Sequence, residues 1–201
     1  MVGSYKTRLL IFVTASSSIL SLLAELWWPA QGAHMRAATL CFFFPSALVL
    51  IWLARKIPRI LGAGCLAGLL AALAYDLYRL PFVLAGLPLF KVFPRFGELL
   101  LGPSMEEIAY QLAGWLYHFC NGAGFGLMYL ALAGPRVRQG SWGAIVFALA
   151  VEAGLLLSPY PEFFNLPINL RFVAITLSAH LVFGAVLGWS LPRLLGKEEL
   201  I

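Results

Sequence analysis

The chain has 201 residues, of which 61% are apolar and only 11% are charged. A soluble domain of this size needs more polar residues to cover its surface, so the composition excludes an ordinary soluble protein and favours a membrane protein. The net charge of +5 comes from short clusters of Lys and Arg between apolar runs, a pattern that membrane topology explains and nucleic-acid binding does not.

Taken in chain order, the apolar runs predict about six transmembrane helices. The expected spans lie near residues 9–28, 37–54, 60–80, 105–133, 142–159 and 170–192. The predicted fold class is therefore an all-α, polytopic integral membrane helix bundle, with residues 1–201 forming a single domain. The first run is longer than the apolar region of a signal peptide, so we expect it to remain as a span.

Residues 81–104 differ from the other apolar segments because four prolines interrupt them: Pro81, Pro88, Pro94 and Pro103. Proline removes a backbone donor and breaks regular helices. The sequence therefore predicts an interfacial or re-entrant segment here.

The basic residues predict the orientation of the six spans. With the N-terminus inside, the inner segments contain Lys6, Arg8, Arg55, Lys56, Arg59, Arg136, Arg138, Arg193 and Lys197. The outer side contains Arg36, Arg79, Lys91, Arg95 and Arg171. Short cytoplasmic loops are enriched in Lys and Arg, so we expect the N- and C-termini to be cytoplasmic. Arg79 could pair with Asp76 or Tyr75 at the interface, but the favoured expectation is that it snorkels from its helix end.

The last four predicted spans contain an internal similarity. Ala72-Leu-Ala-Tyr-Asp76 resembles Ala148-Leu-Ala-Val-Glu152. His118 is followed at intervals of four residues by Gly122 and Gly126, and His180 is followed in the same way by Gly184 and Gly188. The pattern predicts two parallel-repeat hairpins, each with a carboxylate on the first helix and a histidine on the second.

Four ionisable residues fall inside predicted spans: Asp76, His118, Glu152 and His180. A charge at the centre of a membrane helix costs about 2.5–3.5 kcal/mol on insertion scales, so such residues usually face the bundle interior. One hypothesis is interhelical packing, with the glycines forming grooves and the histidines bonding across them. A second is a site for a transition metal, another cation or a proton, formed by all four residues. A third is a haem b held between His118 and His180.

A family resemblance adds one further alternative. Glu106, Glu107 and His180 resemble parts of the motifs of CAAX-type intramembrane proteases. The resemblance implies a water-activating site on these residues. The pattern departs from that family at Gln111, Val151 and Gly184, which stand where an arginine, a histidine and an asparagine are expected.

The sequence thus predicts a multi-pass membrane protein with a candidate site that binds or conducts a cation or a proton. The alternative is a non-catalytic subunit or scaffold of a larger membrane complex. The expected partners are the lipid bilayer and other membrane subunits, and no nucleic acid.

Overall fold

The computed structural model describes residues 4–139 and 141–196, and every regular element in these ranges is helical. The predicted all-α fold class is confirmed. The long helices are α5 (Pro58–Leu84), α7 (Glu107–Ala133), α8 (Trp142–Leu156) and α10 (Leu170–Leu194). Lys197, which the topology prediction places inside, lies outside the described residues.

The first predicted span forms two helices, α1 (Tyr5–Ala15) and α2 (Ser17–Trp27), which are bent by 48° at the break between them. Hydroxyl groups around the break donate to carbonyl groups one turn earlier: Ser16 to Val13 at 2.9 Å and Ser17 to Thr14 at 2.8 Å. Such bonds compete with the helical ladder and bend helices. Hydropathy alone predicted one continuous span here.

The second predicted span is a continuous helical segment of three elements, α3 (Ala33–Ala38), the π-helical turn η1 (Thr39–Phe43) and α4 (Phe44–Ala54). The π-helical turn lies directly before Pro45, which has no backbone donor for the preceding turn. The wide turn accommodates this missing bond without ending the helix.

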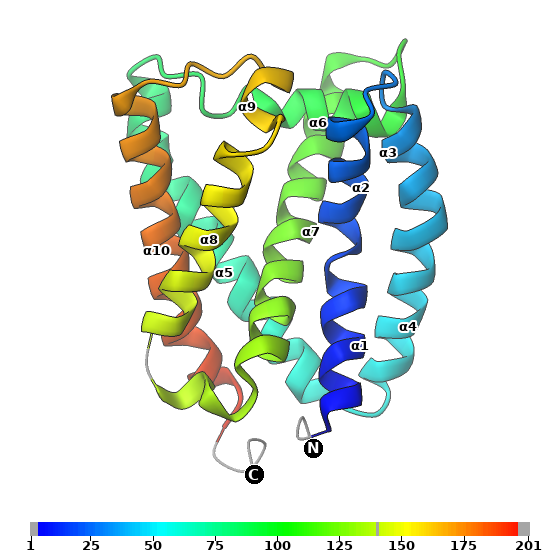
Figure 1. The fold of residues 1–201 in the computed structure, drawn as a ribbon, viewed down its shortest axis with the longest axis vertical. Coiled ribbons are helices and arrows are strands. Elements are labelled where there is room, and N and C mark those ends of the chain that lie inside the picture. Colours follow the sequence, from blue (N-terminus) through cyan, green and yellow to red (C-terminus); the bar gives the residue numbers. More distant parts are fainter. Residues whose placement is uncertain (1–3, 140, 197–201) are drawn as a thin grey trace.

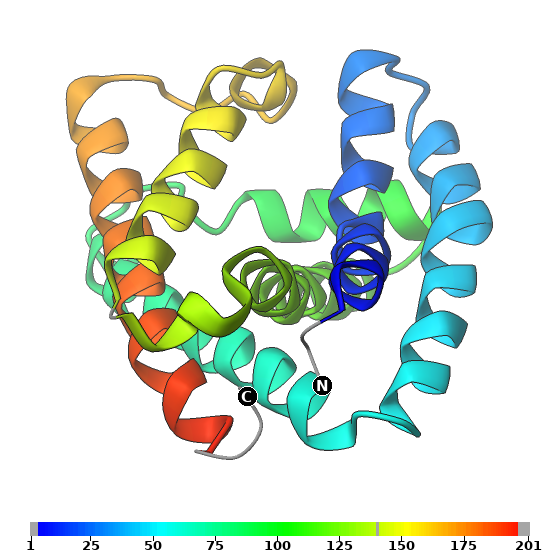
Figure 2. The same cartoon turned by 60° about the horizontal axis from the view of Figure 1, so that its bottom comes forward.

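Residues 81–104 begin with the last turn of α5, which runs through Pro81 to Leu84. The expected helical break at Pro81 is wrong, because α5 continues for one more turn. A proline removes a single donor, and the turn can be completed beyond it. The segment then forms α6 (Val92–Leu101), which lies across one end of the bundle (Figure 2). We call this end the α6 end.

The long helices run roughly parallel to the longest axis of the molecule (Figure 1). The direction of the helices alternates along the chain, and we call each traverse of the bundle a pass. The passes that run toward the α6 end are α1–α2, α5 and α8, and those that run back are α3–α4, α7 and α10. The short helix α9 (Tyr160–Phe163) joins α8 to α10 at the α6 end, and the 3₁₀ helix η2 (Gly134–Gln139) joins α7 to α8 at the opposite end. The start of α1 and the end of α10 therefore lie at the same end of the bundle.

Several helices are long and apolar enough to cross a membrane. They are 33–54, α5 and α10, and the bent pair α1–α2 adds a fourth if it forms one span. Helix α8 is also apolar but has only 15 residues. Large apolar side chains face outward, including Trp142 at 78% exposure and Leu157 at 87%. Such a surface suits lipid better than water.

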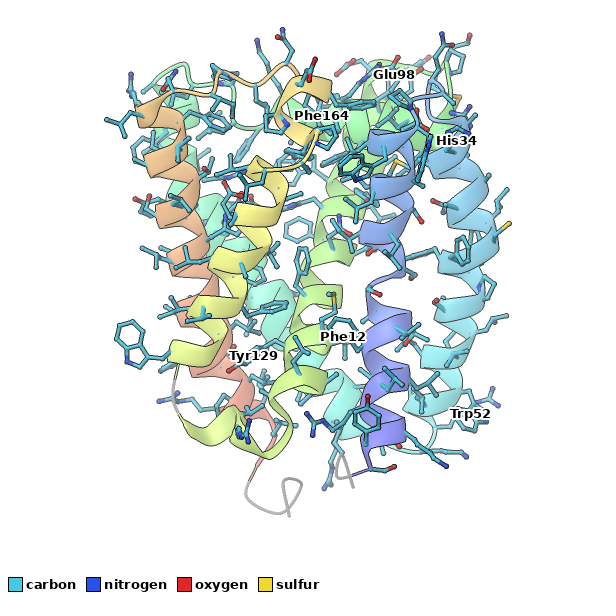
Figure 3. The ribbon with its side chains drawn as sticks, viewed as in Figure 1. Phe12, His34, Trp52, Glu98, Tyr129 and Phe164 are labelled. Carbon is cyan, nitrogen blue, oxygen red and sulfur yellow. The ribbon has the colours of Figure 1, made fainter. Side chains whose placement is uncertain are left out.

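The polar side chains of the outer surface gather toward the two ends. Figure 3 shows the polar residues His34 and Glu98 at the α6 end, and at the opposite end Trp52, whose amphipathic ring is typical of a membrane interface. Helical segments in lipid satisfy their backbone groups internally and keep polar side chains near the interfaces. The distribution agrees with the membrane association that the apolar helices indicate.

Glycines determine how closely the helices of each predicted hairpin approach. A Cβ placed on Gly68 of α5 would lie 2.1 Å from the carbonyl oxygen of Gly122 on α7. A Cβ on Gly184 of α10 would lie 2.5 Å from Cα of Ile145 on α8. Gly122 and Gly184 of the sequence pattern, together with Gly68, thus allow the backbones of α5 and α7, and of α8 and α10, to touch.

Candidate functional site

The contact between α5 and α7 brings Asp76 and His118 together. The Nε2 atom of His118 lies 2.8 Å from Oδ2 of Asp76, and the Asp76 carboxylate is buried. Its other oxygen, Oδ1, accepts a hydrogen bond of 3.1 Å from Nη2 of Arg79, one turn later on α5. The carboxylate is therefore held by one fixed positive charge and one imidazole.

The contact between α8 and α10 brings Glu152 and His180 together in a similar way. The Nδ1 atom of His180 lies 3.3 Å from Oε2 of Glu152 and 3.0 Å from the carbonyl oxygen of Thr176. Because a carbonyl oxygen only accepts, Nδ1 of His180 must carry hydrogen and donate to it. The proton that His180 can gain or lose therefore belongs to Nε2.

The two carboxylates differ in their positive partners. Asp76 forms an ion pair with Arg79, whereas within residues 4–139 and 141–196 no Lys or Arg pairs with Glu152. Arg79 is only 5% exposed, so the expectation that it snorkels to the interface is wrong. Its guanidinium instead donates from Nη1 to the Tyr75 hydroxyl at 3.0 Å and lies 4.2 Å from the centre of the Tyr75 ring.

Tyr75 links the two histidine–carboxylate pairs. The centre of its ring lies 6.2 Å from that of His118 and 4.9 Å from that of His180. The four predicted site residues are thus neighbours, but they form two pairs and not one cluster. In the described part of the chain, no three His, Cys, Asp or Glu residues are grouped closely enough to hold a metal ion. For haem ligation, one nitrogen of each imidazole is already directed at a carboxylate.

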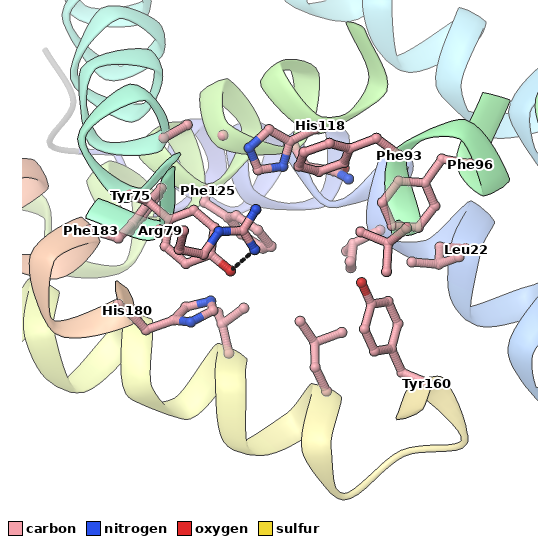
Figure 4. A pocket seen from close by; sticks show the side chains of 18 of the residues that line it. Leu22, Tyr75, Arg79, Phe93, Phe96, His118, Phe125, Tyr160, His180 and Phe183 are labelled. Carbon is pink, nitrogen blue, oxygen red and sulfur yellow. Dashed lines mark hydrogen bonds between the residues drawn. The ribbon is translucent and has the colours of Figure 1, made fainter. Parts of the chain in front are cut away.

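A cavity of about 90 Å³ lies beside the two pairs, and both histidines and Arg79 line it (Figure 4). Its remaining wall is largely aromatic, with Phe93 and Phe96 from α6 and Tyr160 from α9. A second cavity of about 50 Å³ is lined by Glu152, Arg79, Tyr75 and Tyr160 and extends to Leu166 and Phe172 toward the α6 end. Glu152 and His180 therefore contribute to adjoining cavities.

Three phenylalanines lie beyond the histidines, on the side away from the α6 end. The Phe125 ring centre is 6.2 Å from that of Phe147 and 6.3 Å from that of Phe183. They come from α7, α8 and α10 and also line the larger cavity. We call Phe125, Phe147 and Phe183 the phenylalanine layer. It lines the cavity on the side toward the end of the bundle where α1 begins.

Two buried polar atoms near the cavity have no hydrogen-bond partner among the described residues: Nε of Arg79 and Oδ1 of Asn121. Both residues line the larger cavity. Buried polar atoms are rarely left unpaired, and exceptions often mark sites for water, ions or ligands. Sequence reasoning assigned Tyr160 to an aromatic belt and did not place it at the site, because its short helix carries no motif and reaches the site only through the fold.

The two glutamates of the protease-like resemblance lie away from this site, whereas its histidine, His180, is part of it. Glu106 and Glu107 are exposed at the start of α7, and Glu107 accepts a hydrogen bond of 3.0 Å from Gln111. At about 1.5 Å per residue, Glu107 is about 16 Å along the axis from His118. The structure therefore does not direct these carboxylates at the buried histidine pairs.

Taken together, the fold and its buried polar pairs define a helical protein with membrane-compatible helices. Residues 58–200 match the model of the Family of unknown function (DUF6789), and the chain belongs to this family. The match covers α5 to α10 and therefore both histidine–carboxylate pairs. No curated protein and no solved structure matches the chain.

Proposed function

We propose that this chain is a six-span membrane protein in which the Glu152–His180 pair binds a proton and exchanges it between the two cavities. In the six-span arrangement both termini are cytoplasmic and the α6 end faces outward. Two observations support the arrangement: the six passes run alternately along the bundle, and α1 begins at the same end where α10 finishes. The basic residues favour that end as the cytoplasmic one.

The charge balance of the buried site supports proton binding. Asp76 and Glu152 contribute two negative charges, and Arg79 contributes one positive charge. With both histidines neutral, a net charge of −1 would be buried in the bundle, which is costly in a medium of low dielectric constant. One bound proton makes the site neutral. Since Arg79 already neutralises Asp76, we assign this proton to Glu152 and His180.

The position of the pair supports exchange of that proton. Glu152 lines the smaller cavity and His180 lines the larger one. A proton that enters beside Leu166 reaches the carboxylate of Glu152 first. Because Nδ1 of His180 already carries hydrogen, the proton then passes through the adjoining cavities to Nε2, which releases it into the larger cavity. The phenylalanine layer lines this cavity toward the proposed cytoplasmic end, so we expect passage across the membrane to require these rings to move.

We also infer that α5–α7 and α8–α10 arose as two copies of one hairpin. Each has a carboxylate on its first helix within 3.3 Å of a histidine on its second. Each also has glycines of the second helix against the first, and Ala72 and Ala148 are buried at equivalent positions. Among the residues that the structure describes, the copies then differ in their basic partners, since an arginine, Arg79, pairs with the carboxylate of the first copy and none with that of the second.

Proton movement is tested in liposomes that contain the full chain. A potassium gradient with valinomycin sets the membrane potential, and a trapped pH-sensitive dye reports proton entry. We expect entry with the wild type and at least an about tenfold slower rate with Glu152→Gln, because the amide cannot take the proton. The matched control is Glu107→Gln, the same change at an exposed carboxylate. Equal rates for wild type and Glu152→Gln would contradict the proposal.

A further inference from the structure

The larger cavity combines features of a binding site for an organic anion. About 90 Å³ is room for about six to nine water-sized groups at about 10–15 Å³ each. Its wall is mostly apolar and aromatic, and a few polar groups converge on it, which is typical of small-molecule sites. The cavity also contains a buried cation, Arg79, that retains an unpaired donor.

We propose that this cavity binds a small aromatic carboxylate together with one additional proton. This inference rests on the proposed proton site and names the class of molecule that the same site accepts. The carboxylate of the ligand accepts the Nε–H of Arg79, and its ring packs among the phenylalanines of the wall (Figure 4).

The guanidinium of Arg79 is positioned for such a ligand before it arrives. Nη1 and Nη2 are held by Tyr75 and Asp76, and the Tyr75 ring supports the planar group from one face. Nε is the remaining nitrogen, and its hydrogen has no acceptor among the described residues. A carboxylate oxygen supplies that acceptor and forms a charge-assisted hydrogen bond.

The hydroxyl of Tyr160 provides a second donor. Figure 4 shows it directed into the cavity from α9. Burial raises the pKa of the Tyr160 phenol, which keeps the group protonated and able to donate. Asn121, with its unpaired Oδ1, provides an acceptor on another wall and suits a ring that carries a hydroxyl.

The charge balance couples the anion to a proton. Before the ligand binds, the site has no net charge when it holds one proton. A bound carboxylate returns the net charge to −1 unless the site takes up a second proton. His118 and His180 each have one nitrogen not directed at a carboxylate, and these atoms accept the proton. The titratable and charged groups that face His180 are Tyr75, Asp76 and Arg79 of α5, His118 of α7, Glu152 of α8 and Tyr160 of α9.

The test uses the full chain in lipid nanodiscs and benzoate as the probe, with benzyl alcohol as the uncharged control. Titration calorimetry in two buffers of different ionisation enthalpy measures both the Kd and the protons taken up. We expect benzoate to bind, benzyl alcohol to bind at least about tenfold more weakly, and uptake of about one proton per benzoate. The Kd should then fall by up to about tenfold for each unit of decreasing pH.

The variant Asp76→Asn/Arg79→Gln removes both members of the ion pair and keeps the site neutral, so that folding is preserved. We expect it to lose benzoate binding by at least about tenfold, while Arg171→Gln, an exposed change on α10, leaves it unaltered. Absence of benzoate binding to the folded wild type, binding that the double variant retains, or binding without proton uptake would each overturn the inference. Proton entry that Glu152→Gln slows would still support the proposed function in those cases.

Discussion

The Nη2 atom of Arg79 lies 3.1 Å from Oδ1 of Asp76, and both side chains are buried. This ion pair makes the α5–α7 hairpin different from the α8–α10 hairpin, in which Glu152 pairs with a histidine and with no arginine of the described ranges. One carboxylate thereby has a fixed positive partner, while the other has an imidazole as its partner. The difference leads to a prediction about stability.

Removing Arg79 alone should destabilise the fold more than removing the whole ion pair. Arg79→Gln leaves Asp76 as an uncompensated buried charge, and breaking a buried pair in this way typically costs about 3–5 kcal/mol. The double variant Asp76→Asn/Arg79→Gln should recover most of this loss. Thermal unfolding in detergent, followed by circular dichroism, measures the difference. A double variant less stable than Arg79→Gln would show that the ion pair has another role.

The glycine contacts should tolerate no side chain. Gly68→Ala would place a Cβ 2.1 Å from the carbonyl oxygen of Gly122 and force α5 away from α7. We expect a loss of about 1–3 kcal/mol, as in other overpacked interiors, and displacement of Asp76 from His118. Gly62→Ala is the matched control on the same helix, because a Cβ there meets nothing within 4 Å. It should be neutral or stabilise by up to about 1 kcal/mol.

The phenylalanine layer should control access from the cytoplasmic end. Phe147→Ala removes the ring that lies beside Phe125 and joins the cavity to the space below it. We expect faster proton entry into liposomes than with the wild type, with continued dependence on Glu152. Phe12→Ala, on α1 and away from the cavity lining, serves as the control. An unchanged rate in Phe147→Ala would place the barrier elsewhere.

The six-span topology predicts that Lys56 and Lys91 lie on opposite sides of the membrane. Both side chains are exposed, and they sit at opposite ends of α5. In a variant without the three native cysteines, a cysteine at position 91 should react with an impermeant thiol reagent on intact cells. A cysteine at position 56 should react only after the membrane is opened. Equal labelling of both positions on intact cells would contradict the topology.

Much of the helical framework could be predicted from the sequence. The expected span 170–192 corresponds to α10, Leu170–Leu194, and the expected span 105–133 corresponds to α7, Glu107–Ala133. Length and continuous hydropathy identify α10 directly, whereas α7 is long but does not count among the helices apolar enough to cross a membrane. The break at Ser16 could not be found in this way, because it depends on side-chain hydroxyls competing for backbone carbonyls.

The site was predicted less completely than the helices. The sequence suggested Asp76, His118, Glu152 and His180 as interior residues, because buried ionisable groups are costly in lipid. Their division into two pairs depends on the rotation of each helix about its own axis, which hydropathy does not specify. Arg79 illustrates the same limit: its place near a helix end suggested an interfacial residue, yet its side chain points inward to Asp76 and Tyr75.

The short length of α8 has an electrical consequence for a protein with six spans. Its 15 residues cover about 22 Å at about 1.5 Å per residue, while the hydrocarbon core of a bilayer is about 30 Å thick. The cavities beside its α6 end allow water or a hydrated ligand to replace part of the insulating layer. The membrane potential, about 2.3 kcal/mol per charge for each 100 mV, then falls mainly across the phenylalanine layer. Movement of a proton past Phe125, Phe147 and Phe183 should therefore be the voltage-dependent step, and loading of Glu152 from outside nearly voltage-independent.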